Sequence, residues 1–223
     1  MSPIISIRKV AVSLAIFAVV TLASATMAQA DTVTFNLNIG SSLPSQQYGT
    51  ITLTLVGSDI QVDIALLAGN RIVNTGFDAS VAFNYIGTGQ IGVTGLPGTY
   101  TLVNDGNPSN VDMDGFGRFE YGVLFNTEGG GAGTDSSLTF TVTRVGGFAS
   151  VFDLVQGSTN PPGSISSPFS VDIICDTCGP GGGPATGPIG TGGPIPEPTS
   201  MLLLGSGLLG LGAGIRRRLR KSS

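Results

Sequence analysis

Three sets of residues have types and spacing suited to chemistry. The first follows the pattern N-x-D-x-D-G, with Asn110, Asp112 and Asp114, which resembles the start of a calcium-binding loop. The last ligand position of such a loop would be Tyr121, and the nearest acidic residue, Glu120, lies one position earlier. Three interpretations stay open: an EF-hand, a different calcium site that uses these four oxygen-bearing residues, or an acidic surface turn.

The second set is Cys175-Asp176-Thr177-Cys178, which holds both cysteines of the chain. In an exported protein this spacing favours a structural disulfide over free thiols or redox chemistry. A metal site would need further ligands, and the chain contains neither another cysteine nor any histidine. We expect a Cys175–Cys178 disulfide with a modest effect on stability, because the loop that it closes is small.

The third set is Glu120 and Glu128, which with the scattered aspartates could supply the carboxylate pair of a glycoside hydrolase. The absence of histidine excludes Ser-His-Asp and Cys-His nucleophile systems and the usual catalytic zinc sites. The absence of tryptophan removes the largest flat surface for binding sugars. We expect no enzymatic activity and no cofactor, with calcium as the weak alternative.

The charge of the chain restricts its partners. Between residues 31 and 196 there are 13 acidic residues and three basic residues, Arg71, Arg118 and Arg144, which gives a net charge of −10. Such a surface repels phosphate backbones. We therefore expect no nucleic-acid partner.

Alternating apolar and polar residues predict β-strands that present one face to a core. Residues 32–39 alternate strictly, and residues 51–55 and 60–64 predict a hairpin with a turn at Gly57-Ser58. Further strands are expected at 81–86, 118–125, 138–142 and 169–174. The many short strands indicate an all-β fold, an antiparallel, jelly-roll-like β-sandwich.

One segment departs from this alternation. Phe148, Val151, Phe152 and Val155 recur at the spacing of a helical apolar stripe. We expect one short helix there, covering an end of the sandwich.

The N-terminus predicts export. Arg8 and Lys9 precede an uncharged stretch at 10–25, and Ala28 and Ala30 form an A-x-A cleavage site. We expect residues 1–30 to be a signal peptide that the Sec machinery and signal peptidase handle, although an uncleaved membrane anchor is the alternative reading.

We expect residues 31–178 to form the folded domain, with 169–174 as its last strand. Glycine and proline supply 14 of the 20 residues from 179 to 198. This composition predicts a flexible spacer at 179–195 that packs against nothing. Ending the chain after Gly179 should then cost little stability.

The C-terminus predicts a second membrane-directed segment. Residues 199–215 are 17 residues without a charge, about 25 Å long as a helix and therefore marginal for crossing a bilayer. The glycines among them weaken that helix further. Five basic residues follow within 216–221 and favour a cytoplasmic end, which leaves the folded domain outside.

Pro196-Glu197-Pro198, the Leu/Gly-rich span and the basic end together resemble the PEP-CTERM sorting signal of Gram-negative bacteria that make exopolysaccharide. The resemblance implies that exosortase, a membrane cysteine transpeptidase, recognises residues 196–223 and removes the apolar segment. The protein would be anchored transiently in the inner membrane and then reach the cell surface or extracellular matrix. The expected function is that of a non-enzymatic surface or matrix protein associated with exopolysaccharide or a biofilm. A carbohydrate- or calcium-binding module is the alternative.

Overall fold

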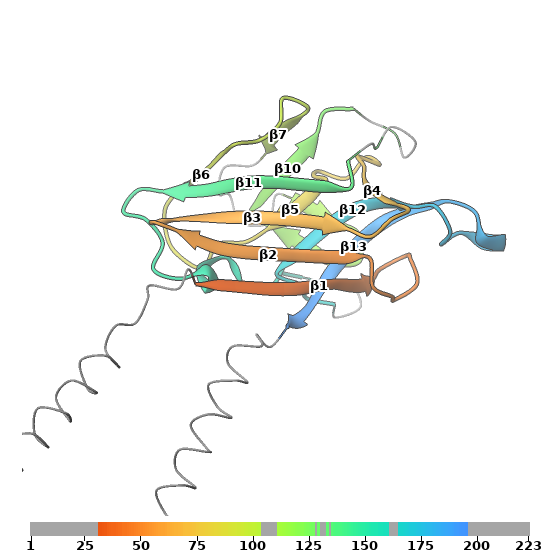
Figure 1. The fold of residues 1–223 in the computed structure, drawn as a ribbon, viewed down its shortest axis with the longest axis horizontal. Helices are drawn as coiled ribbons and strands as arrows, with labels where there is room; N and C mark the ends of the chain where they lie inside the picture. Colours follow the sequence, from red (N-terminus) through yellow and green to blue (C-terminus); the bar gives the residue numbers. More distant parts are fainter. Residues whose placement is uncertain are drawn as a thin grey trace, which may run out of the picture. The chain divides into compact units, whose positions relative to one another are not determined.

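The computed structural model describes residues 31–103, 111–127, 129, 133, 135–160 and 165–195 (Figure 1). The predicted all-β, antiparallel class is confirmed, since every pairing between the described strands is antiparallel. The strands are β1 (Thr32–Gly40), β2 (Gly49–Val56), β3 (Asp59–Leu66), β4 (Asn70–Ile72), β5 (Val81–Phe83), β6 (Ile91–Thr94), β7 (Tyr100–Val103), β8 (Val111–Met113), β9 (Gly117–Phe119), β10 (Tyr121–Phe125), β11 (Ser137–Arg144), β12 (Phe169–Cys175) and β13 (Ala185–Pro194).

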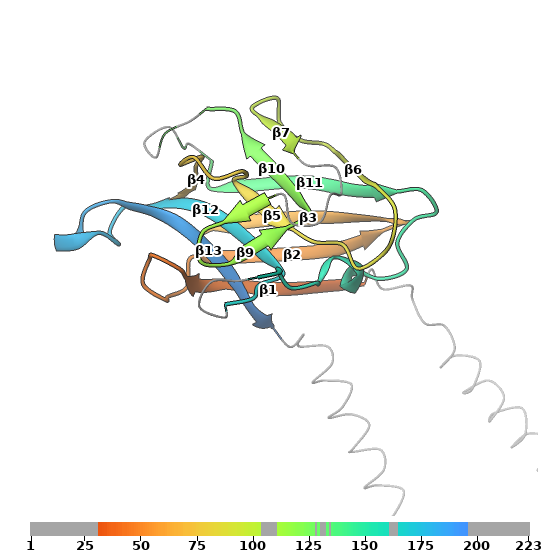
Figure 2. The same cartoon turned by 180° about the vertical axis from the view of Figure 1, so that it is seen from behind.

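A single sheet supplies both layers of the sandwich. Its strand order is β6-β11-β3-β2-β1-β13-β12-β5-β10-β7, with β4 beside β12. The strands from β11 to β1 form one layer in Figure 1, and β12, β5 and β10 lie in the other, which faces the viewer in Figure 2. The two ends of this path, β6 and β7, are consecutive in the chain and are joined by residues 95–99. The sheet is therefore nearly closed, like a barrel.

The hairpin of β2 and β3 has the predicted turn at Gly57-Ser58. Ile51 pairs with Ile64 and Leu53 pairs with Val62, and all four side chains are buried. Gly57, in the turn, has φ of 67°, a conformation that glycine adopts without steric cost. Alternation predicted these strands because one face meets the core and the other meets solvent.

The core between the two layers is centred on Phe83 of β5. Its ring centroid lies 5.8 Å from that of Tyr121 and 6.0 Å from those of Phe140 and Phe169. Phe140 belongs to β11 in the opposite layer, so the rings connect the two halves of the sheet. Such aromatic pairs stabilise beyond the area that they bury.

A smaller cluster covers the outer face of the second layer. The β8–β9 hairpin contributes Val111, Met113, Phe116 and Phe119, which are fully buried. Figure 2 shows β9 on this side of the molecule. The hairpin packs on β5, β10 and β13, through Ala82, Gly122 and Gly190. Every residue of β12 is buried as well.

The prediction of a flexible spacer at 179–195 is wrong, because residues 185–194 form the strand β13. This strand pairs with β1 on one side and with β12 on the other, so it lies in the interior of the sheet. Ile189 is fully buried, and a Cβ added to Gly190 would lie 2.3 Å from Cε1 of Phe116. The glycines are thus packed by the side chains of their neighbours. The folded domain extends past Cys178, and Ile195 still donates a backbone hydrogen bond to Thr34.

The expected helix over residues 148–155 is shorter than predicted. Only Val151–Leu154 forms a 3-10 turn, η1, and a second such turn, η3, spans Pro180–Gly182. Ser150 caps η1 by accepting a hydrogen bond from the amide of Phe152. Phe148, Val151 and Leu154 are buried but Phe152 is half exposed, so the residues did not form the predicted single stripe.

Candidate functional site

The predicted calcium residues lie on the β8–β9 hairpin, beside a polar hollow. Asp112 and Asp114 line this hollow together with Gly76, Phe77 and Asp78, and its volume is about 290 Å³. Asp78 comes from the loop that precedes β5, and its Oδ2 accepts a hydrogen bond of 3.0 Å from the amide of Asp112. The arrangement concentrates three carboxyl groups at one open surface.

The hairpin turn at this hollow has the features of an acidic surface turn. Gly115 has φ of 82°, as the predicted loop glycine requires. Asp112 faces Arg118 across the hairpin, with 3.9 Å between Oδ2 and Nη2, and both side chains are more than half exposed. An exposed pair at this distance contributes little to stability.

Glu120 does not join these carboxylates. It follows β9, and its amide donates a 2.8 Å hydrogen bond to Oδ1 of Asn84. Burial raises the pKa of Glu120, and a hydrogen bond from the backbone of Tyr85 partly offsets this rise. In the described part of the chain no three acidic side chains converge closely enough to hold a metal ion. Asn110 and Glu128 lie outside the described residues, so the calcium site and the carboxylate pair stay predictions.

The predicted Cys175–Cys178 disulfide is present, with 5.5 Å between the two Cα atoms. It begins the connection from β12 to β13. Asp176, inside its loop, accepts hydrogen bonds of 3.0 and 2.7 Å from the two terminal nitrogens of Arg71, and this pairing lowers the pKa of the Asp176 carboxyl. The amide of Asp176 also bonds to the carbonyl of Gly69. The bridge and these bonds hold the turn together, which is a structural role.

The C-terminal end of the domain lies where the predicted sorting signal begins. Pro194 ends β13 opposite Phe35 of β1, and the Ile195 amide donates a 2.7 Å hydrogen bond to Thr34. The sorting residues Pro196, Glu197 and Pro198 follow directly and lie outside the described residues, as do Ala28 and Ala30 of the predicted signal peptide. Within the described ranges no helix is long and apolar enough to cross a membrane.

A folded β-domain that runs directly into a Pro-Glu-Pro motif, an apolar segment and a basic end has the organisation of an exported protein sorted through its C-terminus. The family comparison identifies that signal: residues 194–218 match the PEP-CTERM protein-sorting motif. The chain therefore carries a PEP-CTERM signal, which marks it as an exported substrate of exosortase. No curated protein and no solved structure matches the chain.

The surroundings of two carboxyl groups, Asp78 at the hollow and Asp172 in β12, had no signal in the sequence. Asp78 lies 34 positions before Asp112, and only the fold brings them to the same hollow. Asp172 occupies a strand position that alternation would assign to solvent, yet it is fully buried and accepts hydrogen bonds from the amide and hydroxyl of Thr75.

Proposed function

We propose that this chain is a non-enzymatic surface or matrix protein that exosortase releases from its C-terminal segment into an exopolysaccharide layer. The observation that supports this most is the direct passage from β13 into the matched motif. The strongly acidic ectodomain and the absence of histidine support a structural role over catalysis. The exopolysaccharide setting comes from the resemblance of the signal.

The fold limits where exosortase can cut. A protease needs backbone that can enter its active site, and residues up to Ile195 are held in the sheet, the last of them by its bond to Thr34. Prolines at 196 and 198 favour extended backbone immediately afterwards. Cleavage should therefore fall after Ile195, and the mature protein should keep all of β13.

We expect three outcomes in cells that carry exosortase. The unaltered chain should yield a mature form whose C-terminus lies beyond Ile195. Glu197→Ala should leave the apolar segment attached and the protein in the membrane fraction. A chain that ends at Pro198 should be exported without membrane retention. Intact mass and fractionation of each protein measure both termini and location.

The matched control is Asp114→Ala, which removes an exposed carboxylate from the domain and leaves the signal unchanged. It should be processed like the unaltered chain. Identical mature mass and location for the Glu197→Ala variant, the shortened chain and the control would overturn sorting through this signal.

A second candidate function, a calcium- or carbohydrate-binding module, has one observation in its favour, the hollow lined by Asp78, Asp112 and Asp114. These three carboxyl groups do not converge closely enough to hold a metal ion by themselves, so a calcium site here would need further oxygen ligands, such as Asn110. If this function holds, calcium should raise the melting temperature of the domain, and Asp112→Asn with Asp114→Asn should abolish the shift. No shift with calcium, together with no binding on a glycan array, would reject it.

A further inference from the structure

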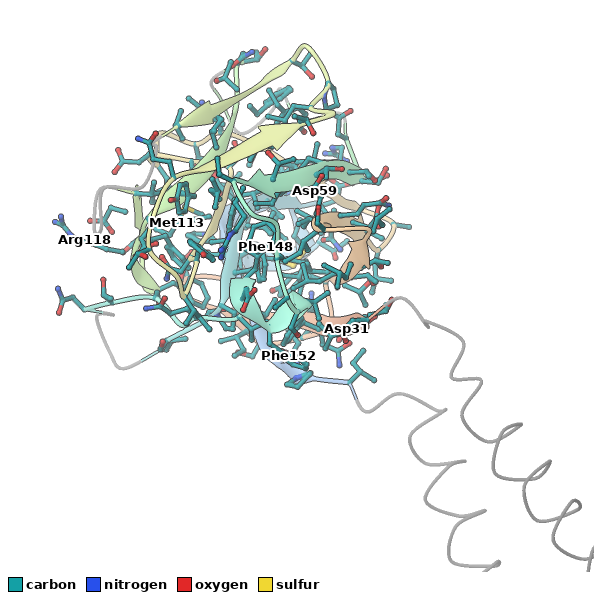
Figure 3. The ribbon with its side chains drawn as sticks, turned by 90° about the vertical axis from the view of Figure 1, so that its left-hand side faces the viewer. Asp31, Asp59, Met113, Arg118, Phe148 and Phe152 are labelled. Carbon is teal, nitrogen blue, oxygen red and sulfur yellow. A yellow bond between two sulfur atoms is a disulfide. The ribbon has the colours of Figure 1, made fainter. Side chains whose placement is uncertain are left out.

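Most of the exposed large apolar side chains of the domain lie at one end. The described residues include six such side chains: Val56, Leu67, Ile86, Val145, Phe152 and Ile195. Leu67 follows β3 and lies at the opposite end of that strand from the β2–β3 turn. Val56, Ile86, Val145 and Phe152 belong to the loops at the end that carries Asp31, Asp59 and Phe148, which faces the viewer in Figure 3. We call this the exit end. Ile195 follows β13 and lies beside Thr34, near this end.

Hydrogen bonds connect the loops of the exit end. The turn that carries Val145 bonds to the β2–β3 turn, which Val56 precedes, through the Phe148 amide and the Ser58 carbonyl at 2.8 Å. Ile86 donates a 2.9 Å backbone hydrogen bond to the carbonyl of Asp153, in the 3-10 turn of Phe152. The apolar side chains therefore belong to neighbouring loops.

Both ends of the described domain also lie at or near the exit end. Asp31, its first residue, accepts a 2.8 Å hydrogen bond from the Ser150 hydroxyl at the cap of η1, and the two regions lie together in Figure 3. Ile195, its last residue, is bonded to Thr34 near the start of β1. The described chain thus ends close to the exit end, beside a residue of β1 that follows Asp31 by three positions.

The domain core does not need these exposed side chains. The buried apolar residues of this end already belong to the main core: Phe148, Val151 and Leu154. Val145 is 97% exposed and Phe152 is 50% exposed. Single exposed apolar side chains are common on protein surfaces, but several on neighbouring loops provide an end that can meet an apolar partner.

The length of the following chain identifies that partner. Only residues 196–198 separate Ile195 from the apolar segment at 199–215. Three residues span about 10 Å even when fully extended. The headgroup layer outside the hydrocarbon is roughly 5–8 Å thick on each side of a bilayer. A domain held by this segment must therefore keep Ile195 close to the membrane surface, which brings the neighbouring exit end near the lipid.

We infer that the exit end rests on a lipid bilayer while the C-terminal segment is attached, with its exposed apolar side chains in the headgroup and upper acyl-chain layer. This inference rests on the proposed function, which supplies the membrane-held state. The contact is shallow and apolar. The end carries three acidic residues, Asp31, Asp59 and Asp153, which do not attract anionic lipids. The guanidinium of Arg144 lies over the rings of Tyr85 and Phe148, with its Cζ 5.4 and 5.7 Å from their centroids.

A contact of this kind holds only while the domain is tethered. The attached segment keeps the exit end at a high effective concentration next to the lipid, and cleavage removes that advantage. The released domain then has a few apolar loop tips and a net negative surface, which is insufficient for stable attachment. Processing by exosortase would thus free the domain from the membrane in a single step.

Depth-dependent fluorescence quenching tests this inference. The full chain from residue 31 is inserted into vesicles of phosphatidylethanolamine with a minor share of phosphatidylglycerol. A bimane probe is attached through Val145→Cys, and the native cysteines stay oxidised in their disulfide. Leu67→Cys is the matched control, since Leu67 is an exposed apolar residue at the other end. Nitroxide-labelled lipid should quench the probe at 145 several times more strongly than the probe at 67.

Two further measurements define the outcome. Phe152→Asp should reduce the quenching at position 145, because it places a charge in the contact, and a chain that ends at Ile195 should show no quenching at either position. Equal quenching at 145 and 67 in the inserted chain would overturn the inference. Extraction with alkaline carbonate reports separately on whether the C-terminal segment is inserted. A chain that stays in the vesicles leaves the proposed function intact. An extracted chain overturns both the proposed function and the membrane contact of the exit end.

Discussion

A secreted chain that ends at Gly179 should fail to fold, whereas one that ends at Ile195 should unfold cooperatively. The shorter chain lacks β13, which provides hydrogen bonds to β1 on one side and to β12 on the other. Its loss leaves two interior strands with unpaired backbone groups next to the core. The two layers of the sandwich would also lose the strand that joins them.

The free energy lost with the interactions of β13 is large compared with the free energy of unfolding of a domain of this size. Ile189 leaves the main core, and Thr191 leaves a buried set of hydrogen bonds in which its amide bonds to the Ser167 hydroxyl at 2.8 Å. Unpaired buried groups cost about 1–3 kcal/mol each. Because whole domains are stable by only about 5–15 kcal/mol, the loss of two strand pairings should exceed the available stability.

Circular dichroism and thermal melts of the two secreted chains measure this outcome. A matched pair of substitutions checks the position of β13 without shortening the chain. Gly190→Ala places a methyl group against Phe116 and should destabilise by about 1–3 kcal/mol. Gly193→Ala adds the same group in the same strand, where nothing lies within 4 Å, and should have little effect. A chain ending at Gly179 that melts like the longer one would contradict the observed strand order.

The sequence predicted those strands whose two faces meet different surroundings. β1, β2 and β3 alternate because one face is in the core and the other is in solvent, and their hairpin turn has the expected glycine. The disulfide was also predictable, because its spacing and the expected export both favour it. These features depend on local sequence.

β13 could not be recognised in this way. Its sequence, ATGPIGTGGP, has one large apolar residue, Ile189, and no alternation. It is nevertheless buried in its centre, because the side chains of Phe116 and Leu43 occupy the space beside its glycines. A run of small residues predicts a segment without packing, but here the glycines permit the close approach of neighbours from distant parts of the chain.

The same limit applies to the candidate sites. The N-x-D-x-D-G pattern located the acidic hairpin turn, but the third carboxylate of the hollow, Asp78, is supplied by the fold. In β12, Asp172 alternates with Val171 and Ile173 and should face solvent. The loop after β4 contacts Asp172 on that face through Thr75, and Asp172 is buried.

Asp172 is held in its position by the loop that follows β4. Its Oδ2 accepts hydrogen bonds of 2.8 Å from the Thr75 amide and 2.6 Å from the Thr75 hydroxyl. Its Oδ1 has no hydrogen-bond partner among the described residues. Burial disfavours the carboxylate and raises the pKa of Asp172 from 3.8 to about 6, although the bonds from Thr75 oppose the rise.

This shift predicts that Asp172 destabilises the domain as the pH rises. Between pH 3.8 and about 6 the folded domain keeps a proton on Asp172 that the unfolded chain has released. Stability from this group is therefore fully present below pH 3.8 and is lost as the pH rises through about 6, by about 3 kcal/mol in total. Asp172→Asn carries no such charge, so it should not show this loss.

The measurement is urea unfolding of the domain that ends at Ile195, with and without Asp172→Asn, at pH values on both sides of this interval. The difference in unfolding free energy should change in favour of the variant by about 2–3 kcal/mol as the pH rises from about 4 to about 7. A constant cost of placing an asparagine side chain in this site cancels from that change, because it is present at both pH values. Asp114→Asn, at an exposed carboxylate, should leave the pH profile of the domain in its original form. If the difference for Asp172→Asn is the same at both pH values, the carboxyl group binds its proton equally well in the folded and unfolded states, and burial does not raise its pKa.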